Sequence, residues 1–268
     1  MRRVAIIAAM PAELKPLTRG WRHERLNGVD LWRWRFDDGE WFAACAGAGV
    51  ERAARAFVEV EKSGELDSVI STGWAGALRE ELVSGQAYDV SCVIDAKTGE
   101  RFLTQIAGVF VGGPPNETQV LRLRCAPLRM TEYGDNPELW LVTNAKVADA
   151  AEKQRLASTY QAALVDMEAA AIARLARMRG IPFYCIKGIS DGYSDQLPDF
   201  NRFISTDGQF QLLRFVFFAL VRPWHWRALI RMGENSRKAA RNIAAFVLDL
   251  LDERGNIRKL NGYPKHQR

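Results

Sequence analysis

Residues 165–171 read Val-Asp-Met-Glu-Ala-Ala-Ala, and residues 187–192 read Lys-Gly-Ile-Ser-Asp-Gly. The first stretch opens a strongly helical run, whereas the second closes an apolar run that is typical of a buried strand. We therefore expect Glu168 at a helix N-terminus and Asp191 at the carboxyl end of a strand. Ligands bind at these places in open α/β sheets. Because a buried carboxylate without a partner is costly, the pair indicates a ligand site.

Strands and helices alternate on both sides of these stretches. The pattern predicts an α/β fold: a single-domain, three-layer α/β/α sandwich over residues 1–268, with a central mixed sheet and a helical C-terminal extension over residues 208–268. The expected strands cover residues 3–9, 31–36, 41–46, 69–72, 87–94, 101–111, 139–143, 164–165 and 181–189. The expected helices follow Pro11 and cover residues 50–62, 148–160, 167–179, 209–220, 226–232 and 235–252, and residues 191–206 are expected to form a lid.

Composition and charge exclude several classes of protein. The chain is 48% hydrophobic and 26% charged, which is ordinary for a globular protein. Its net charge of +5 divides into −3 over residues 1–208 and +8 over residues 209–268, but no nucleic-acid-binding module is present, so we expect no nucleic-acid partner. No signal peptide follows Arg2-Arg3, and neither cysteines nor histidines have metal-ligand spacing. We expect a cytoplasmic protein without metal or other cofactor. The four cysteines, expected to be reduced thiols, are Cys45, Cys92, Cys125 and Cys185.

Four stretches together resemble the nucleoside phosphorylase and nucleosidase superfamily. The most similar branch is that of the methylthioadenosine/S-adenosylhomocysteine nucleosidases. The stretches are residues 6–13 (Ile-Ile-Ala-Ala-Met-Pro-Ala-Glu), 47–50 (Gly-Ala-Gly-Val), 71–76 (Ser-Thr-Gly-Trp-Ala-Gly) and the linked pair 165–171 with 189–191. The fold of this family is a mixed sheet flanked by helices, which agrees with the pattern of strands and helices above.

The reaction of this family explains why acidic residues are needed. Cleavage of a purine N-glycosidic bond passes through a ribosyl cation-like state, and the purine leaves as an anion unless it is protonated. A general acid beside the base is therefore valuable, typically about 10²–10⁴-fold. A carboxylate at the ribose hydroxyls positions the sugar and stabilises the cation. Another carboxylate can activate water, as in glycosidases.

The resemblance assigns these roles to individual residues. It implies that Asp191 protonates the purine and Ser190 orients it. It implies that Glu168 binds the ribose hydroxyls with Met167 against the sugar, and that Glu13 activates water. The substrate-binding residues implied in addition are Gly49, Gly73 and Trp74.

Each assignment has a structural alternative. Glu168 is alternatively a surface acid near a helix start, and Asp191 a loop cap. Glu13 is alternatively a solvated helix position, since an acid in a first helical turn is common. Gly47 and Gly49 are alternatively turn glycines without a ligand.

Two positions in residues 71–74 depart from the family pattern. Phosphorylases of this superfamily supply an Arg and a Ser or Thr to phosphate from the matching stretch, where this chain has Ser71 and Trp74. An indole offers a donor but no positive charge, so water is the expected acceptor. The nucleosidase pattern also has a small hydroxyl residue where Trp74 stands, and no Phe that could stack on adenine occurs in residues 143–147.

The sequence therefore predicts a purine nucleosidase that hydrolyses the N-glycosidic bond of an adenine nucleoside such as methylthioadenosine or S-adenosylhomocysteine. Two alternatives stay open. One is a phosphorylase that releases adenine from an adenosyl-lipid of the hopanoid type, and the other is a catalytically silent nucleoside-binding module.

The most hydrophobic part of the chain is residues 212–221, which Arg222, Trp224 and Trp226 follow. The run is too short to span a bilayer. It is consistent with a core helix plus the interface of a homodimer, which we expect. The alternative is a peripheral membrane contact, with Trp and Arg at headgroup level.

Overall fold

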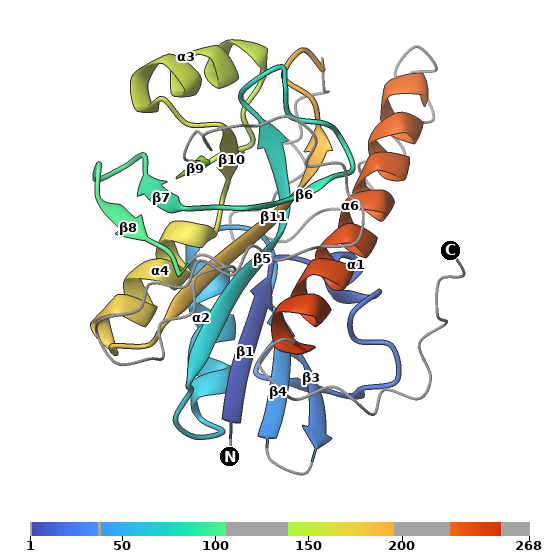
Figure 1. The fold of residues 1–268 in the computed structure, drawn as a ribbon, viewed down its shortest axis with the longest axis vertical. Coiled ribbons are helices and arrows are strands. Elements are labelled where there is room, and N and C mark those ends of the chain that lie inside the picture. The colour runs from blue at the N-terminus through green and yellow to red at the C-terminus, as the bar shows by residue number, and fades with distance from the viewer. Residues whose placement is uncertain (1, 37–38, 106–138, 196–225, 253–268) are drawn as a thin grey trace, which may run out of the picture.

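A computed structural model of the chain describes residues 2–36, 39–105, 139–195 and 226–252. Within these ranges one mixed sheet has helices on both faces, which confirms the predicted α/β fold (Figure 1). The strands are β1 (Arg2–Ala8), β2 (Arg22–Leu26), β3 (Val29–Phe36), β4 (Gly39–Cys45), β5 (Ser68–Ala77), β6 (Ala87–Asp89), β7 (Cys92–Asp95), β8 (Arg101–Leu103), β9 (Trp140–Thr143), β10 (Leu164–Asp166) and β11 (Phe183–Asp191). The helices are α1 (Pro11–Leu14), α2 (Val50–Glu61), α3 (Ala150–Tyr160), α4 (Ala169–Met178) and α6 (Trp226–Asp252).

Strand β5 organises the sheet. The strand order is β2-β3-β4-β1-β5-β10-β9-β7-β8, and β11 pairs with β5 and with β6 outside this path. β1 and β11 are both parallel to β5, whereas β10 runs antiparallel along the last residues of β5. As a result the carboxyl end of β1 lies beside the middle of β5, and those of β10 and β11 lie beside its last residues.

The alternation of side chains along β1 produces the three layers. Ala5 and Ile7 belong to the core on the side of α2 and α4, whereas Val4 and Ile6 belong to the core on the side of α6. Both sets are buried because successive strand residues point to opposite faces of the sheet. An apolar strand covered on both faces needs a helical layer on each side, and Figure 1 shows α6 (red) and the pair α2 and α4 on opposite sides.

The C-terminal helix is part of this sandwich. Residues 226–232 and 235–252, which the sequence divided into two helices, form the single helix α6. Its apolar residues Ala240, Ile243 and Val247, which follow the expected break, recur at helical spacing and are buried. No helix in the described ranges is long and apolar enough to cross a membrane.

The sequence did not predict β2, β8 already ends at Leu103, and two other expected strands differ clearly in their bounds. β5 does not end at residue 72 but continues to Ala77, because Gly73 adopts a φ of 123° that lets the strand pass this point. The expected strand 87–94 is two strands, β6 and β7. The backbone changes partners between them: the N–H of Val90 bonds to Cys185, and that of Ser91 bonds to Leu139.

Several expectations fall outside the described residues. They are the second half of the expected strand 101–111, the lid beyond Asp195, the helix 209–220, and the side chains of the hydrophobic run 212–221.

Candidate active site

Three buried carboxylates lie around the second half of β5. Glu13 is in α1, directly after β1; Glu168 is the N-cap residue of α4, directly after β10; and Asp191 is the last residue of β11. Each has 7% or less of its surface exposed. The structure therefore brings together the three acids that the sequence singled out, at the strand ends where α/β proteins bind ligands.

Glu13 is held by backbone N–H groups from two segments. Its Oε2 atom accepts hydrogen bonds from Ala9 (2.9 Å) and Met10 (2.7 Å), and its Oε1 atom accepts one from Trp74 (2.8 Å). Burial raises the pKa of Glu13 above its ordinary value, against these three donors, which lower it. The carboxylate is thus fixed in position and is a stronger base than a solvated one.

Gly73 makes this approach of α1 to β5 feasible. A Cβ atom at this position would lie 2.8 Å from Oε1 of Glu13, and the positive φ of Gly73 is unfavourable for other residues. Gly73 therefore serves the site indirectly, because any larger residue at this position would displace the carboxylate of Glu13.

Glu168 is bound by a second glycine. Its Oε1 atom accepts a hydrogen bond from the N–H of Gly49 (2.8 Å), which is the N-cap residue of α2, and its Oε2 atom accepts one from Met167 (3.3 Å). A Cβ atom on Gly49 would meet open space, so only its φ of 98° requires glycine. Met167 is half-buried beside the carboxylate. Residues 49, 167 and 168 thus form one part of the site.

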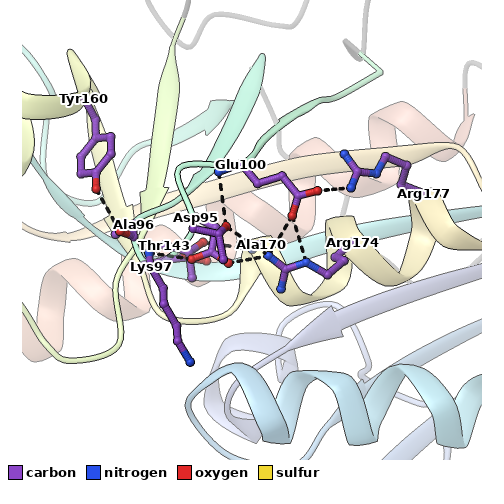
Figure 2. A network of polar contacts seen from close by, with 11 residues as sticks. Asp95, Ala96, Lys97, Glu100, Thr143, Tyr160, Ala170, Arg174 and Arg177 are labelled. Atoms are coloured by element: carbon purple, nitrogen blue, oxygen red, sulfur yellow. Dashed lines mark hydrogen bonds and ion pairs between the residues drawn. The ribbon is translucent and has the colours of Figure 1, made fainter.

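The first turn of α4 holds Glu168 in place. Below it, the hydroxyl of Thr143 donates to Asp166 (2.7 Å) and accepts from the N–H of Ala170 (3.0 Å). Figure 2 shows this contact between Thr143 and Ala170. Farther along α4, Arg174 bonds to Asp95 (2.6 Å) and Glu100 (3.0 Å), which ties the helix to β7 and to the turn after it.

A buried ion pair, which the sequence did not predict, lies between Glu168 and Glu13. Lys187 Nζ is 2.8 Å from Asp166 Oδ2, and both side chains have 1% or less exposure. Burial alone would lower the pKa of Lys187, but Asp166 raises it, so the lysine stays charged. A lysine inside an apolar strand needs a carboxylate partner, and this is the signal that could have revealed the pair.

A β-bulge places Ser190 and Asp191 side by side. Ile189 is opposite Ala75 and Asp191 is opposite Gly76, so Ser190 is an extra residue in β11. Neighbouring residues of a regular strand point to opposite faces, but here the Ser190 hydroxyl lies 2.6 Å from Asp191 Oδ1. Bulges are frequent next to active sites because they redirect a side chain in this way.

Asp191 also has a partner that the sequence analysis missed. Lys153 Nζ, from α3, lies 2.5 Å from Asp191 Oδ2 and 2.7 Å from the Gly192 carbonyl oxygen. The lysine is buried, with 1% exposure. The available signal was its place on the apolar face of a predicted helix, three residues before Leu156 and seven before Tyr160.

Trp74 connects the site to α6. Its backbone N–H donates to Glu13, and its indole Nε1 donates to the backbone carbonyl of Ser236 (2.9 Å). The ring is therefore fixed between β5 and α6. Glu13, Ser190 and Asp191 thus contact or pair with residues 74–76 of β5, whereas Gly49, Met167 and Glu168 form a separate hydrogen-bonded group.

The pKa of Glu168 is raised from its ordinary 4.5 to about 8. Burial is the larger cause, and repulsion from the nearby Asp166 carboxylate is the next. Between these values the folded protein binds more protons than the unfolded chain, so this contribution to stability is present below about pH 4.5 and is lost as the pH rises through about 8. We expect Glu168→Gln to remove this dependence. The difference in unfolding free energy between variant and wild type should grow, in favour of the variant, by on the order of 2 kcal/mol from pH 6 to pH 9.

Urea unfolding of both proteins across this pH range measures the difference. Glu65→Gln, at an exposed position, is the matched control for loss of a carboxylate. Parallel profiles of wild type and Glu168→Gln would show that Glu168 does not titrate in this range.

Comparisons with known proteins identify the family and the fold. A family model described as the phosphorylase superfamily matches residues 3–120 and 139–214. No curated protein sequence matches the chain. Among solved structures, the chain is similar to the 5′-methylthioadenosine/S-adenosylhomocysteine nucleosidase of Helicobacter pylori, with a TM-score of 0.63, 16% identity and coverage of 94% of this chain and 98% of that one.

Two further structures are similar over the same length. The S-adenosylhomocysteine nucleosidase of Streptococcus pyogenes gives a TM-score of 0.65 at 18% identity, and covers 94% of this chain and 97% of its own. The futalosine hydrolase of Helicobacter pylori strain 26695 gives a TM-score of 0.64 at 15% identity, with coverage of 94% and 98%. At these identities the structural likeness establishes the fold.

Proposed function

The chain belongs to the phosphorylase superfamily, and on this premise we propose that it is a purine nucleosidase that hydrolyses the N-glycosidic bond of an adenine nucleoside. The observation that carries the proposal is a set of three buried carboxylates that directly follow or end β1, β10 and β11; Glu13 bonds to Trp74 of β5 and Asp191 is paired with Gly76. The similar nucleosidase and hydrolase structures support the same class of reaction.

The spacing along β5 supports the division of roles. Glu13 bonds to residue 74, and Asp191 is paired with residue 76. At a rise of about 3.3 Å per residue, these two positions of β5 lie roughly 7 Å apart, so the two acids reach the strand at different points.

We assign one step to each acid. Asp191 donates a proton to a ring nitrogen of the purine, and Ser190 orients the base beside it. Glu168 binds the ribose hydroxyls, with Met167 against the sugar. Glu13, with its raised pKa, accepts a proton from the attacking water as the bond from C1′ to the purine breaks.

The surroundings of residues 71–74 favour water over phosphate as the acceptor. Ser71 is fully buried within β5, and the indole N–H of Trp74 already donates to Ser236. The two buried lysines near the carboxylates, Lys153 and Lys187, are each paired with an aspartate. A phosphate dianion would need accessible donors and unpaired positive charge at the sugar, and these residues do not supply them.

The test is the release of base. Purified protein is incubated with methylthioadenosine, S-adenosylhomocysteine and adenosine, each with and without phosphate, and the base and sugar products are separated by chromatography. We expect adenine and a free ribose derivative, at rates that phosphate does not change. Ribose 1-phosphate derivatives as the main product would identify a phosphorylase. Thermal stabilisation by nucleosides without any base release would identify a nucleoside-binding module.

Three further expectations from the sequence stay predictions. They are a single domain over residues 1–268, a homodimer, and location in the cytoplasm with or without a peripheral membrane contact. Light scattering and vesicle sedimentation would test the assembly and the membrane contact.

A further inference from the structure

Lys153 is placed at Asp191 by the fold of α3. Asp149 caps this helix, and its Oδ1 atom accepts a hydrogen bond from the N–H of Glu152 (2.9 Å). One turn of the helix then carries Lys153 into the core, where its ammonium reaches Asp191 and the Gly192 carbonyl. A buried ammonium is costly unless it is paired, so the buried Lys153 needs the carboxylate of Asp191 as its partner.

The sequence of β5 leaves space for the pair. A Cβ atom on Gly76 would lie 3.0 Å from Asp191 Oδ2 and 3.3 Å from Lys153 Cε. Both distances are tighter than ordinary contacts. Gly76 thus permits the close approach of acid and ammonium, as Gly73 does for Glu13.

The Oδ1 atom of Asp191 faces the hydroxyl of Ser190, which can bond both to an ionised and to a protonated carboxyl group. The Ser190 hydroxyl lies 2.6 Å from Asp191 Oδ1 and 3.3 Å from the carbonyl oxygen of Ala75. A hydroxyl has one hydrogen, so it can donate to only one of them. When Asp191 is ionised, Ser190 donates to it. When Oδ1 carries a proton, Asp191 donates to Ser190 and Ser190 donates to Ala75.

The other charged groups around Asp191 have partners of their own. In the segment after β11, Asp195 accepts from the N–H of Gly192 and is paired with Arg231 of α6. On β10, Asp166 is paired with Lys187. Residues 73–76 of β5 carry no charged side chain. Of the described groups, Lys153 is therefore the one whose charge acts on Asp191 through a direct contact.

We propose that Lys153 is a positioning residue for proton donation by Asp191. Its ammonium holds Oδ2, which leaves Oδ1 as the oxygen that carries the proton, and it stabilises the carboxylate that remains after donation. The inference rests on the proposed nucleosidase activity. In the step concerned, the O–H bond of Asp191 breaks and an N–H bond forms on the purine. The electron pair of the glycosidic bond goes to the base, and Asp191 later regains a proton from solvent.

The test is the pH dependence of kcat/KM in Lys153→Met, a neutral side chain of similar length. Loss of the ammonium favours the neutral carboxyl group, so the alkaline limb of the profile should move to higher pH. On the plateau, kcat should fall about 10–100-fold because the carboxylate product is no longer stabilised, whereas KM should change less. Lys62→Met, in which an exposed lysine loses its pair with Glu59, is the matched control and should leave the profile unchanged.

The outcomes separate this inference from the proposed function. If wild type releases no base, the proposed function fails and the inference fails with it. If wild type is active and Lys153→Met keeps the wild-type profile and kcat, only the inference fails. A fall in kcat without movement of the alkaline limb also contradicts it, since a purely structural lysine would act in this way.

A second variant covers the case in which Lys153→Met does not fold. Gly76→Ala leaves both charges in place but pushes Asp191 Oδ2 and Lys153 apart. The alkaline limb should move in the same direction by a smaller amount. An unchanged limb in a folded Gly76→Ala protein would overturn the proposal.

Discussion

Asp191→Asn is expected to lower kcat by about 10²–10⁴-fold while the protein stays folded. An amide cannot give a proton to the leaving purine as an acid does. The new side chain can still satisfy its neighbours: its oxygen can accept from Lys153, and its NH₂ group can donate to Ser190, which then donates to Ala75. The expected loss is therefore chemical.

Steady-state kinetics on methylthioadenosine, together with thermal unfolding of the same preparation, measure this effect. Asp195→Asn is the matched control, because it makes the same change four residues away, at a carboxylate paired with Arg231. It should cost far less turnover. Near-normal kcat in folded Asp191→Asn would mean that the base leaves without this acid.

Glu13→Gln is expected to lower kcat by about 10²–10³-fold, with a smaller effect on KM. The amide cannot accept the proton of the attacking water. It also turns an NH₂ group towards the backbone N–H of Trp74 or those of Ala9 and Met10, which should destabilise the protein by about 1–3 kcal/mol.

Two measurements separate these effects. Turnover is expressed per folded protein, and urea unfolding gives the stability. Glu51→Gln, at an acid in the first turn of α2, is the control for a helix-start carboxylate. If Glu13→Gln loses stability but keeps its turnover per folded molecule, Glu13 is only a structural clamp between α1 and β5.

Local patterns were enough to predict much of the fold and the identity of the acids. The alanine run from residue 169 favours a helix, Gly180 ends it with a φ of 66°, and the apolar run to Ile189 is a strand buried on both faces. Glu168 and Asp191 could therefore be placed at a helix start and at a strand end. Both signals depend on neighbours in the sequence.

The features that were missed depend on distant segments. The bulge at Ser190 exists only because β11 shifts its register against β5, and the division of β6 from β7 reflects a change of partner strands. Lys153 is 38 residues from Asp191 in the sequence. No local pattern specifies which carboxylate a buried lysine will meet, and this explains why the pair became visible only in three dimensions.

The bond between Trp74 and Ser236 has a consequence for the order in which the protein matures. The acids and glycines of the site all lie before residue 192, but the carbonyl that holds the indole of Trp74 comes from α6, 162 residues after Trp74. A chain still being made on the ribosome lacks this partner until Ser236 has left the exit tunnel. A nascent chain that already carries all three acids therefore still lacks this contact, and we expect full activity only after α6 has docked.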